Sequence, residues 1–384
     1  MLHFFGLNVK LLKFAGVWVY EDQLSILNVY NVICIFYSMI FFTFSQIISL
    51  KDSRKAKIDL IRNINMTTSF VLSLYKLTKW FLWRKEILSI MKTLSDTSIF
   101  DFYNKKKIIE TNKKVKDNLI KIFHSLSIAV SSICFLTRLF QIIFNEEYNQ
   151  ELPYQSWIPF EYKSSKFQHM LAVFMQCLAL FNCGSITVGL DMLYTALVML
   201  TTVHFKLLRE AFKNIQKKVL NDLKIKHEDE KFIKKCEDEL KKLIQHLQVV
   251  LKICDDLETI YSSLIFAQLL VSLVVLCTCM FLVTTVPIGS IGNDLAYFLA
   301  IENQLALYCY TGNELTLNAI SLPNSLFHSD WIHLSKQFKH NLRFTIMRMS
   351  KPVYLTIGKF SPLTLQTFVT IGRASYSLLA IIKR

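Results

Sequence analysis

The chain has 384 residues, of which 52% are hydrophobic and 19% are charged, with thirty phenylalanines but only nine glycines and six prolines. Soluble domains of this length usually have more charge and more glycine, so the composition excludes an ordinary soluble protein and favours long helices in a membrane. The formal net charge is +15, but no nucleic-acid-binding motif accompanies it, so nucleic acid is not expected as a partner.

The cysteines and the known catalytic motifs give no sign of chemistry. Cys277 and Cys279 are two positions apart, unlike a CxxC pair, and no histidine stands nearby at metal-binding spacing. The sequence has no phosphate-binding glycine loop, no HExxH motif and no nucleophile elbow. We therefore expect free thiols, no metal, no cofactor, no catalytic residue and no enzyme. The first twenty residues lack the pattern of a cleaved signal peptide.

Seven segments are apolar over about the 20 residues that a membrane-spanning helix needs. In chain order they are Gln23–Leu50, Asn63–Phe81, Leu119–Phe144, Phe167–Leu190, Thr259–Asn293, Leu295–Leu322 and Ser361–Ile382. The first, fourth and fifth contain no charge, and the fourth continues past Asp191 to Phe205. The sequence therefore predicts an all-α membrane protein with seven spans.

The distribution of Lys and Arg predicts the orientation, because cytoplasmic loops are enriched in these residues. The linker 76–121 contains 12 of them and the linker 206–258 contains 13, whereas the loop 145–166 contains two. This pattern places the N-terminus in the cytoplasm and the C-terminus outside. The basic stretch KDSRKAK after the first span is the exception.

Residues 206–258 show apolar side chains at helical spacing with charge on the opposite face. The pattern predicts that the fourth and fifth spans continue into the cytoplasm and meet at the charged turn KIKHEDEK. An isolated solvated hairpin and a helical anchor where subunits meet both fit it. Charges inside spans, such as Asp191 and Glu302, either face a polar interior or mark the end of a span.

Bulky, soft side chains gather in the outer halves of spans two to six. They include Phe70, Leu74, Phe135, Met170, Phe174 and Tyr297. Such a set could line a pocket for a small apolar molecule. Ordinary helix–helix packing explains the same periodicity, so the pattern alone does not decide between the two.

Four blocks in the last third of the chain resemble the insect odorant receptor family. They are YCYTGNELT, which begins at Tyr308, then SLFHSDW (Ser325–Trp331), RFTIMRMSKP (Arg343–Pro352) and GKFSPLTLQTFVTIGRASYSLLAII (Gly358–Ile382). The resemblance implies an odorant-gated, non-selective cation channel in the plasma membrane of sensory neurons. It also implies a hetero-tetramer with the shared odorant co-receptor and a small apolar volatile ligand, with membrane lipid around it. The short linker after span four indicates the odorant-tuning subunit.

The resemblance also implies a division of the chain. Residues 1–205 would hold spans one to four and the outer pocket, 206–258 the cytoplasmic helical linker, 259–322 spans five and six, 323–360 the anchor helix and 361–384 the pore helix. The expected gate is a ring of Ile381, supported by Leu378, with Ser377 in the polar lining. Arg373 does not suit a pore-lining position, because a ring of positive charges would repel cations. A gustatory-type channel and a metabotropic seven-helix receptor are the alternatives.

YCYTGNEL falls at the cytoplasmic end of span six under this topology. Gly312 would allow close helix approach, and Glu314 would pair with neighbouring helices. We therefore expect this block to couple the pocket to the pore rather than to bind ligand.

Overall fold

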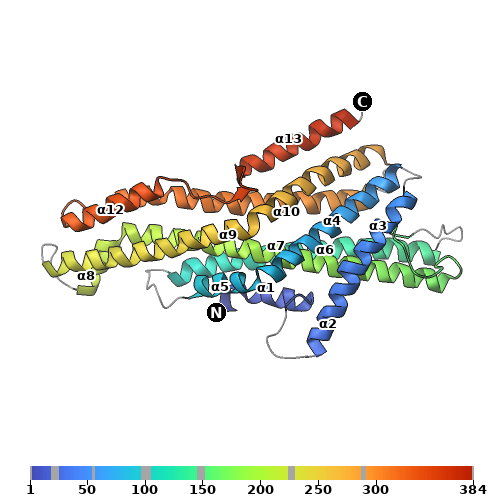
Figure 1. Ribbon diagram of the computed structural model, residues 1–384, viewed down its shortest axis with the longest axis horizontal. Coiled ribbons are helices and arrows are strands. Elements are labelled where there is room, and N and C mark those ends of the chain that lie inside the picture. Colours follow the sequence, from blue (N-terminus) through green and yellow to red (C-terminus); the bar gives the residue numbers. More distant parts are fainter. Residues whose placement is uncertain are drawn as a thin grey trace.

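The computed structural model describes residues 2–18, 26–53, 57–96, 105–144, 152–223, 230–286 and 291–382. They form an elongated bundle of helices (Figure 1). Parts of the predicted outer loop 145–166, of KDSRKAK and of KIKHEDEK lie outside the described residues, as do residues 287–290 near the end of the predicted fifth span, Gln23 and the last two residues.

The helices and strands follow one another along the chain as α1 (Leu2–Phe14), α2 (Ile26–Ile35), η1 (Phe36–Phe41), α3 (Phe42–Ser53), α4 (Lys57–Leu82), α5 (Arg84–Ser95), α6 (Lys105–Phe144), α7 (Lys166–Lys213), α8 (Ile215–Leu223), α9 (Glu230–Thr285), α10 (Ile291–Ile320), α11 (Leu322–Phe327), α12 (Lys336–Met349), β1 (Thr356–Ile357), β2 (Ser361–Pro362) and α13 (Leu365–Ile382). The two-residue strands pair antiparallel, with Thr356 opposite Pro362. This small hairpin was not expected from the sequence.

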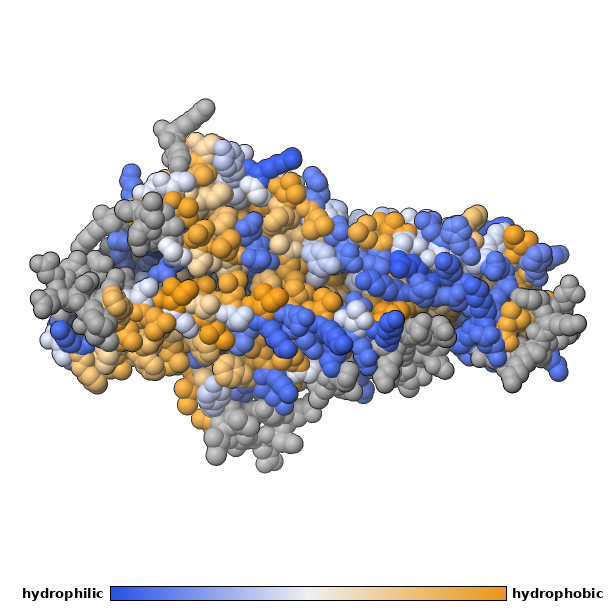
Figure 2. All heavy atoms as spheres, turned by 180° about the vertical axis from the view of Figure 1, so that it is seen from behind, coloured by the Kyte–Doolittle hydropathy of each residue, from blue (hydrophilic) through white to orange (hydrophobic). Residues whose placement is uncertain are grey.

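Four stretches of the described residues are helical, long and apolar enough to cross a membrane: Val29–Lys51, Lys107–Thr137, Lys166–Lys213 and Glu230–Thr285. The other three predicted spans are also mainly helical, as α4, α10 and α13, but the predicted span Ser361–Ile382 begins in β2 and its helix starts only at Leu365. The mean hydropathy of α4 is low because the helix contains polar residues such as Asn63 and Lys76. Both of these residues are buried within the bundle. Figure 2 shows a mainly hydrophobic half at one end of the molecule and a mainly hydrophilic half at the other.

Two helices are much longer than a membrane is thick. At 1.5 Å per residue, the 48 residues of α7 and the 56 residues of α9 extend for about 72 Å and 84 Å, against about 30 Å of hydrocarbon. Both helices therefore continue beyond the bilayer, as the sequence predicts. They also run without a break across the predicted boundaries at 205/206 and 258/259. The positions at which the two helices leave the membrane therefore stay a prediction.

The short helix α8 is held against α9 by an ionic clasp. Lys218 and Lys242 each place Nζ 3.0 Å from a carboxylate oxygen of Glu239. Burial favours the neutral form of this carboxyl, but the hydrogen bonds and charges of the two lysines outweigh burial and lower the pKa of Glu239. The clasp therefore keeps its charge at neutral pH.

Helix α1, which the sequence did not predict, packs on α6 and α7. Lys116 of α6 is fully buried and donates to the Phe4 carbonyl and, at 3.1 Å, to Oδ1 of Asn8. The Asn8 amide donates in turn to the Met192 carbonyl at 2.8 Å. These bonds fix the N-terminal helix inside the bundle.

Gly189 of α7 lets α1 approach closely, and this gives a testable expectation. A Cβ at Gly189 would lie 2.9 Å from Leu12 Cδ2, and Leu12 is fully buried. A Cβ at Gly6 would meet no atom within 4 Å. Gly6→Ala should stabilise the protein by up to about 1 kcal/mol through helix propensity. Gly189→Ala should instead lower its stability by about 1 kcal/mol or more through overpacking. Thermal unfolding of the two purified variants measures this, and equal gains would contradict the contact.

Candidate functional site

A polar layer joins α4, α7 and α10. The Tyr297 hydroxyl bonds Ser69 and also donates to the Asn65 carbonyl at 3.2 Å. One turn further along α4, Ser73 bonds Thr187 of α7 with 2.7 Å between hydroxyl oxygens. Because Ser69 and Ser73 are four positions apart, they lie on one side of α4, which faces α7 and α10. The layer offers hydroxyl groups in surroundings that are otherwise apolar.

Two of the predicted lining residues lie directly beside this layer. Phe70 is 2% exposed, and its ring centroid is 5.1 Å from that of Phe42 on α3. Leu74, one turn further along α4, is half-buried against the core. Phe70 and Leu74 each follow a serine of the polar layer by one position on α4, so they adjoin the layer around Tyr297.

The other predicted lining residues lie on α6 and α7. Phe135 is half-buried and packs against Val173 and Cys177. Met170 and Phe174 are 41% and 53% exposed, so their side chains lie on the outer surface of α7 and not with the group around Tyr297. The ligand-binding role of all six residues stays a prediction.

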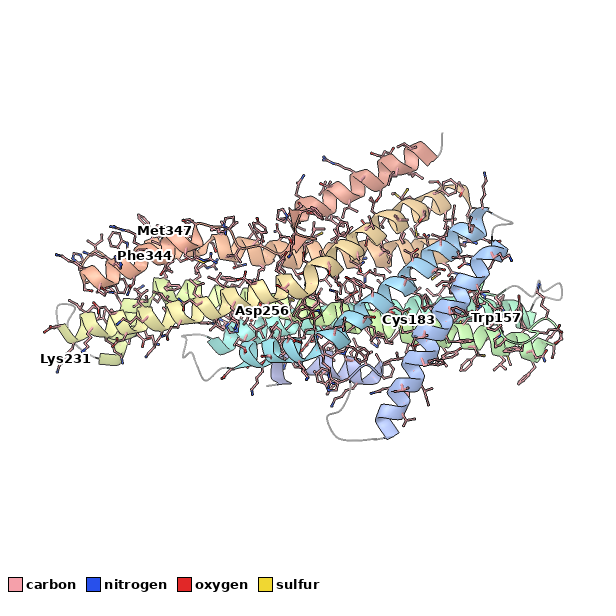
Figure 3. The ribbon with its side chains drawn as sticks, in the orientation of Figure 1. Trp157, Cys183, Lys231, Asp256, Phe344 and Met347 are labelled. Atoms are coloured by element: carbon pink, nitrogen blue, oxygen red, sulfur yellow. The ribbon has the colours of Figure 1, made fainter. Side chains whose placement is uncertain are left out.

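A segment before α7, Leu152–Trp157, forms hydrogen bonds with α3 and α7, and we call it the strap. Gln176 is buried and donates to the Tyr154 carbonyl at 2.8 Å and to Ser156. The backbone N–H of Trp157 donates to the Ser45 carbonyl at 3.2 Å. Figure 3 labels Trp157 at this end and Cys183 nearer the middle of the bundle. The strap therefore joins α3 to α7.

Deeper in the bundle lies a buried charged cluster. Lys76 Nζ is 2.6 Å from Asp191 Oδ1, and the Tyr308 hydroxyl donates to the same oxygen at 2.7 Å. The Gln304 amide donates to the other carboxylate oxygen. Lys76, Asp191 and Tyr308 are 2%, 3% and 1% exposed. A buried ion pair survives only when further hydrogen bonds satisfy it, and Tyr308 and Gln304 provide them.

The cluster extends to α9 and so joins four helices. Gln268 of α9 donates to the Gln304 side chain at 3.1 Å. The Tyr308 ring stacks on Tyr194 at 4.8 Å, and Tyr194 contacts Tyr261 of α9 at 4.9 Å. A cavity of about 20 Å³ adjoins these rings. It has room for about one water molecule, so it is too small for an organic ligand.

Gly312 connects the cluster to the segment before α13. It lies one turn after Tyr308 on α10, and a Cβ there would lie only 2.8 Å from the backbone oxygen of Leu363. Leu363 in turn donates its N–H to the Leu355 carbonyl at 2.8 Å. A close approach at Gly312 is therefore present, but the neighbour is the segment before α13 and not a helix as expected. Glu314, two residues on, lies 3.7 Å from Lys206 of α7.

The hairpin before α13 is fixed to α9. The carboxylate of Glu258 accepts the backbone N–H of Thr356 at 2.8 Å and the hydroxyl of the same residue. The N–H of Gly358 donates to the Ser262 carbonyl at 3.1 Å. Gly358 has φ +58 and needs the conformational freedom of glycine. Sequence reasoning missed this attachment, because nothing in the pattern pairs Glu258 with a hairpin.

Helix α13 contacts α9 and α10 and leaves one side free within the chain (Figure 1). Leu379 is buried, and Ser375 donates to the Leu273 carbonyl of α9 at 3.4 Å. The predicted pore residues Ser377, Leu378 and Ile381 are exposed, as is Arg373. Ile381 is 67% exposed. The gate role of these residues stays a prediction.

Two histidines, His204 of α7 and His246 of α9, are buried. Nδ1 of His204 lies 2.9 Å from Nε2 of His246, and Nε2 of His204 lies 3.0 Å from the Leu94 carbonyl. Since a carbonyl only accepts, Nε2 of His204 carries a proton. The pair joins α7, α9 and the end of α5.

The chain matches the family model described as 7tm Odorant receptor over residues 57–376. It is 24% identical to Odorant receptor 42a of Drosophila melanogaster over 60% of this chain and 55% of that receptor. With Putative odorant receptor 92a of the same fly it shares 26% identity over 51% of this chain and 45% of the relative. The matched segments thus span about half of the length of these relatives. Odorant receptor Or1 of Anopheles gambiae is 21% identical over 99% of this chain and 94% of its own.

The fold is similar to that of the insect olfactory receptor OR5 from Machilis hrabei. The TM-score is 0.79 with 13% identity, covering 98% of this chain and 97% of that one. The same receptor in complex with eugenol gives a TM-score of 0.78 with 13% identity, covering 98% of this chain and 96% of that one. The likeness confirms the predicted all-α fold with seven membrane helices.

Proposed function

Because the chain belongs to the odorant receptor family, we propose that it is the odorant-tuning subunit of a ligand-gated, non-selective cation channel. The family consists of multi-pass membrane receptors and not of enzymes. One observation carries the gating part of the proposal. Helices α4, α7 and α10 carry both the polar layer and the buried cluster around Asp191, and a Cβ at Gly312, one turn after Tyr308, would lie 2.8 Å from the backbone oxygen of Leu363 before α13.

The ligand we propose is a small, mainly apolar volatile that binds in the outer part of the bundle. Phe70, Leu74 and Tyr297 offer burial, and the hydroxyl groups of the polar layer orient the molecule. The binding of eugenol by the related receptor from Machilis hrabei supports this kind of ligand. Dispersion and burial dominate the affinity. The receptor therefore discriminates strongly between ligands of different size and weakly between ligands of different chemical class.

The assembly we propose is a hetero-tetramer with the odorant co-receptor in the plasma membrane of sensory neurons. The N-terminus is cytoplasmic and the C-terminus external. Residues 206–258 and 323–360 form the cytoplasmic anchor, and residues 361–384 form the pore-lining segment. Phe344 and Met347, labelled in Figure 3, are 53% and 63% exposed on α12, which supports a subunit contact there.

Gating follows from a population shift between closed and open arrangements. Ligand binding in the outer layer favours an arrangement in which α13 moves away from the channel axis. In the closed arrangement a ring of Ile381, supported by Leu378, keeps a narrow passage free of water. Ser377 contributes polar lining when the passage is open. Arg373 is exposed on the same helix and faces lipid headgroups or the anchor.

Ile381→Ala should raise the basal current of cells that express the chain with the co-receptor, because a smaller apolar side chain closes the passage less tightly. In the proposed closed ring Ile381 is buried against its copies, so shortening it removes roughly 2 kcal/mol of closed-state contact, equivalent to a rise of tenfold or more. Whole-cell recording without odorant measures it. Tyr376→Ala, on the other side of α13 and equally exposed, is the control that should not change the current. Equal basal currents in all three proteins would contradict the gate assignment.

A further inference from the structure

Gln46 of α3 has a buried side chain without hydrogen-bond partners. It is 0% exposed, and neither Nε2 nor Oε1 bonds to any residue that the structure describes. Leaving a buried amide unpaired costs free energy that native proteins usually avoid. The other buried amide near this end, Gln176, makes hydrogen bonds with the strap. The Gln46 amide therefore has hydrogen-bonding capacity that a further molecule could use.

The position of Gln46 on α3 directs it toward α4 beside the proposed ligand layer. The Phe42 ring packs on Phe70, and Ser49 accepts a hydrogen bond from Asn63 at 2.8 Å. Gln46 is four positions after Phe42 and three before Ser49, so all three share one face of the helix. Its amide consequently lies between the levels of Phe70 and Asn63.

The strap covers this place from the outside. Ser45 donates to the Trp157 carbonyl, and Ser49 donates to the Gln155 carbonyl at 2.7 Å. These bonds and those of Gln176 attach the strap to the neighbourhood of Gln46. A cover held by a few hydrogen bonds can open at a small cost, because each contributes only about 1 kcal/mol net.

The helix has a further irregularity just before Gln46. Residues Phe36–Phe41 form the π-helix η1, and the hydroxyls of Ser38 and Thr43 bond backbone carbonyls on either side of its centre. Single π-helical turns within helices are frequent at functional sites. Such a turn also changes which face the following residues present, and here these include Gln46.

We propose that Gln46 is the orienting contact for the oxygen-bearing end of a small neutral ligand, one with a carbonyl or a hydroxyl group. The Nε2–H₂ group donates to a carbonyl or hydroxyl oxygen, and Oε1 accepts from a hydroxyl. The apolar part of the ligand packs toward Phe42 and Phe70. A charged ligand does not fit, because a buried charge needs a counter-charge. This inference rests on the proposed function in that it names the chemical class of the same ligand.

The test compares the binding of octane, octanone and octanol to the protein in lipid nanodiscs. Binding is measured as the rise in unfolding temperature that each ligand causes. Wild type should bind the ketone and the alcohol about tenfold more tightly than the alkane, as one buried hydrogen bond allows. Gln46→Met, of similar shape, should lose this discrimination while keeping its affinity for octane. Without ligand it should unfold at the same or a higher temperature, since an unpaired amide is removed. Wild type without discrimination, or Gln46→Met with full discrimination, would overturn the proposal.

Thr43→Val is the matched control on the same helix. Thr43 is also buried, but its hydroxyl already bonds the Met39 carbonyl, so the control should keep the wild-type discrimination. If Gln46→Met does not fold, Gln46→Leu takes its place in the same assay. Recording from cells with the co-receptor separates the two proposals. Discrimination at Gln46 without any odorant-evoked current would reject the channel and keep the site. Currents whose selectivity is unchanged by Gln46→Met would reject the site and keep the channel.

Discussion

Asp191→Asn is expected to lower the free energy of unfolding by about 3–5 kcal/mol, because it leaves a buried lysine charge without its counter-charge. Asparagine has nearly the shape of aspartate and still accepts from Tyr308, so the substitution removes little besides the charge. Lys76 is only 2% exposed, so bulk solvent does not stabilise its charge. Thermal unfolding of the purified protein and its amount at the cell surface measure the loss.

Two controls separate the buried pair from a general sensitivity to charge. Lys76→Met added to Asp191→Asn removes the stranded charge and should restore part of the stability. Glu314→Gln breaks the partly exposed pair with Lys206, at 3.7 Å, and should cost less than about 1 kcal/mol. If Asp191→Asn costs no more than Glu314→Gln, the cluster does not hold the helices together as described.

Gly312→Ala is expected to impair gating more strongly than its size suggests. The added methyl group would lie 2.8 Å from the backbone oxygen of Leu363 and 2.9 Å from its side chain, so the segment before α13 must move. Overpacking of this kind costs about 1–3 kcal/mol, which shifts an equilibrium between closed and open channels by roughly 5- to 150-fold. Dose–response curves of odorant-evoked current with the co-receptor measure this shift.

Gly292→Ala on the same helix is the matched control, because a Cβ there would meet no atom within 4 Å. It should leave both the dose–response curve and the surface amount unchanged. A Gly312→Ala channel that reaches the surface and responds like wild type would show that the contact with Leu363 does not take part in gating.

The helical fold could be predicted from the sequence because long apolar runs are a strong signal. The segments around Gln23–Leu50 and Thr259–Asn293 carry no charge, and only a helix satisfies its own backbone over such a length in lipid. The hairpin around Gly358 could not be predicted in this way. Each of its two strands is only two residues long, and it is held in place by Glu258, which lies almost a hundred positions earlier.

The charged cluster could be predicted only in part. Asp191 interrupts an apolar run and Lys76 lies in the second predicted span, so each was noticeable alone. Their pairing depends on how α4 and α7 are placed against each other, and one sequence contains no information about that register. Opposite charges in two predicted spans were nevertheless a signal that they pair.

The lining of the pocket was the least predictable feature. Met170 and Phe174 continue an apolar stripe on α7, but they are exposed, whereas Phe70 on α4 is buried. In a membrane protein the lipid-facing surface is as apolar as a pocket wall, so periodicity does not distinguish the two. The resemblance helped most at Gly312, where a specific block of sequence coincides with a close contact.

The most direct test of the account is to record cation currents from cells that express this chain with the co-receptor, and from cells that express the co-receptor alone, across one panel of volatile molecules. We predict that at least one volatile evokes a rapid, non-selective cation current only when both subunits are present, without a G protein. If both subunits reach the cell surface and no volatile evokes more current than the co-receptor alone, the proposed function is contradicted.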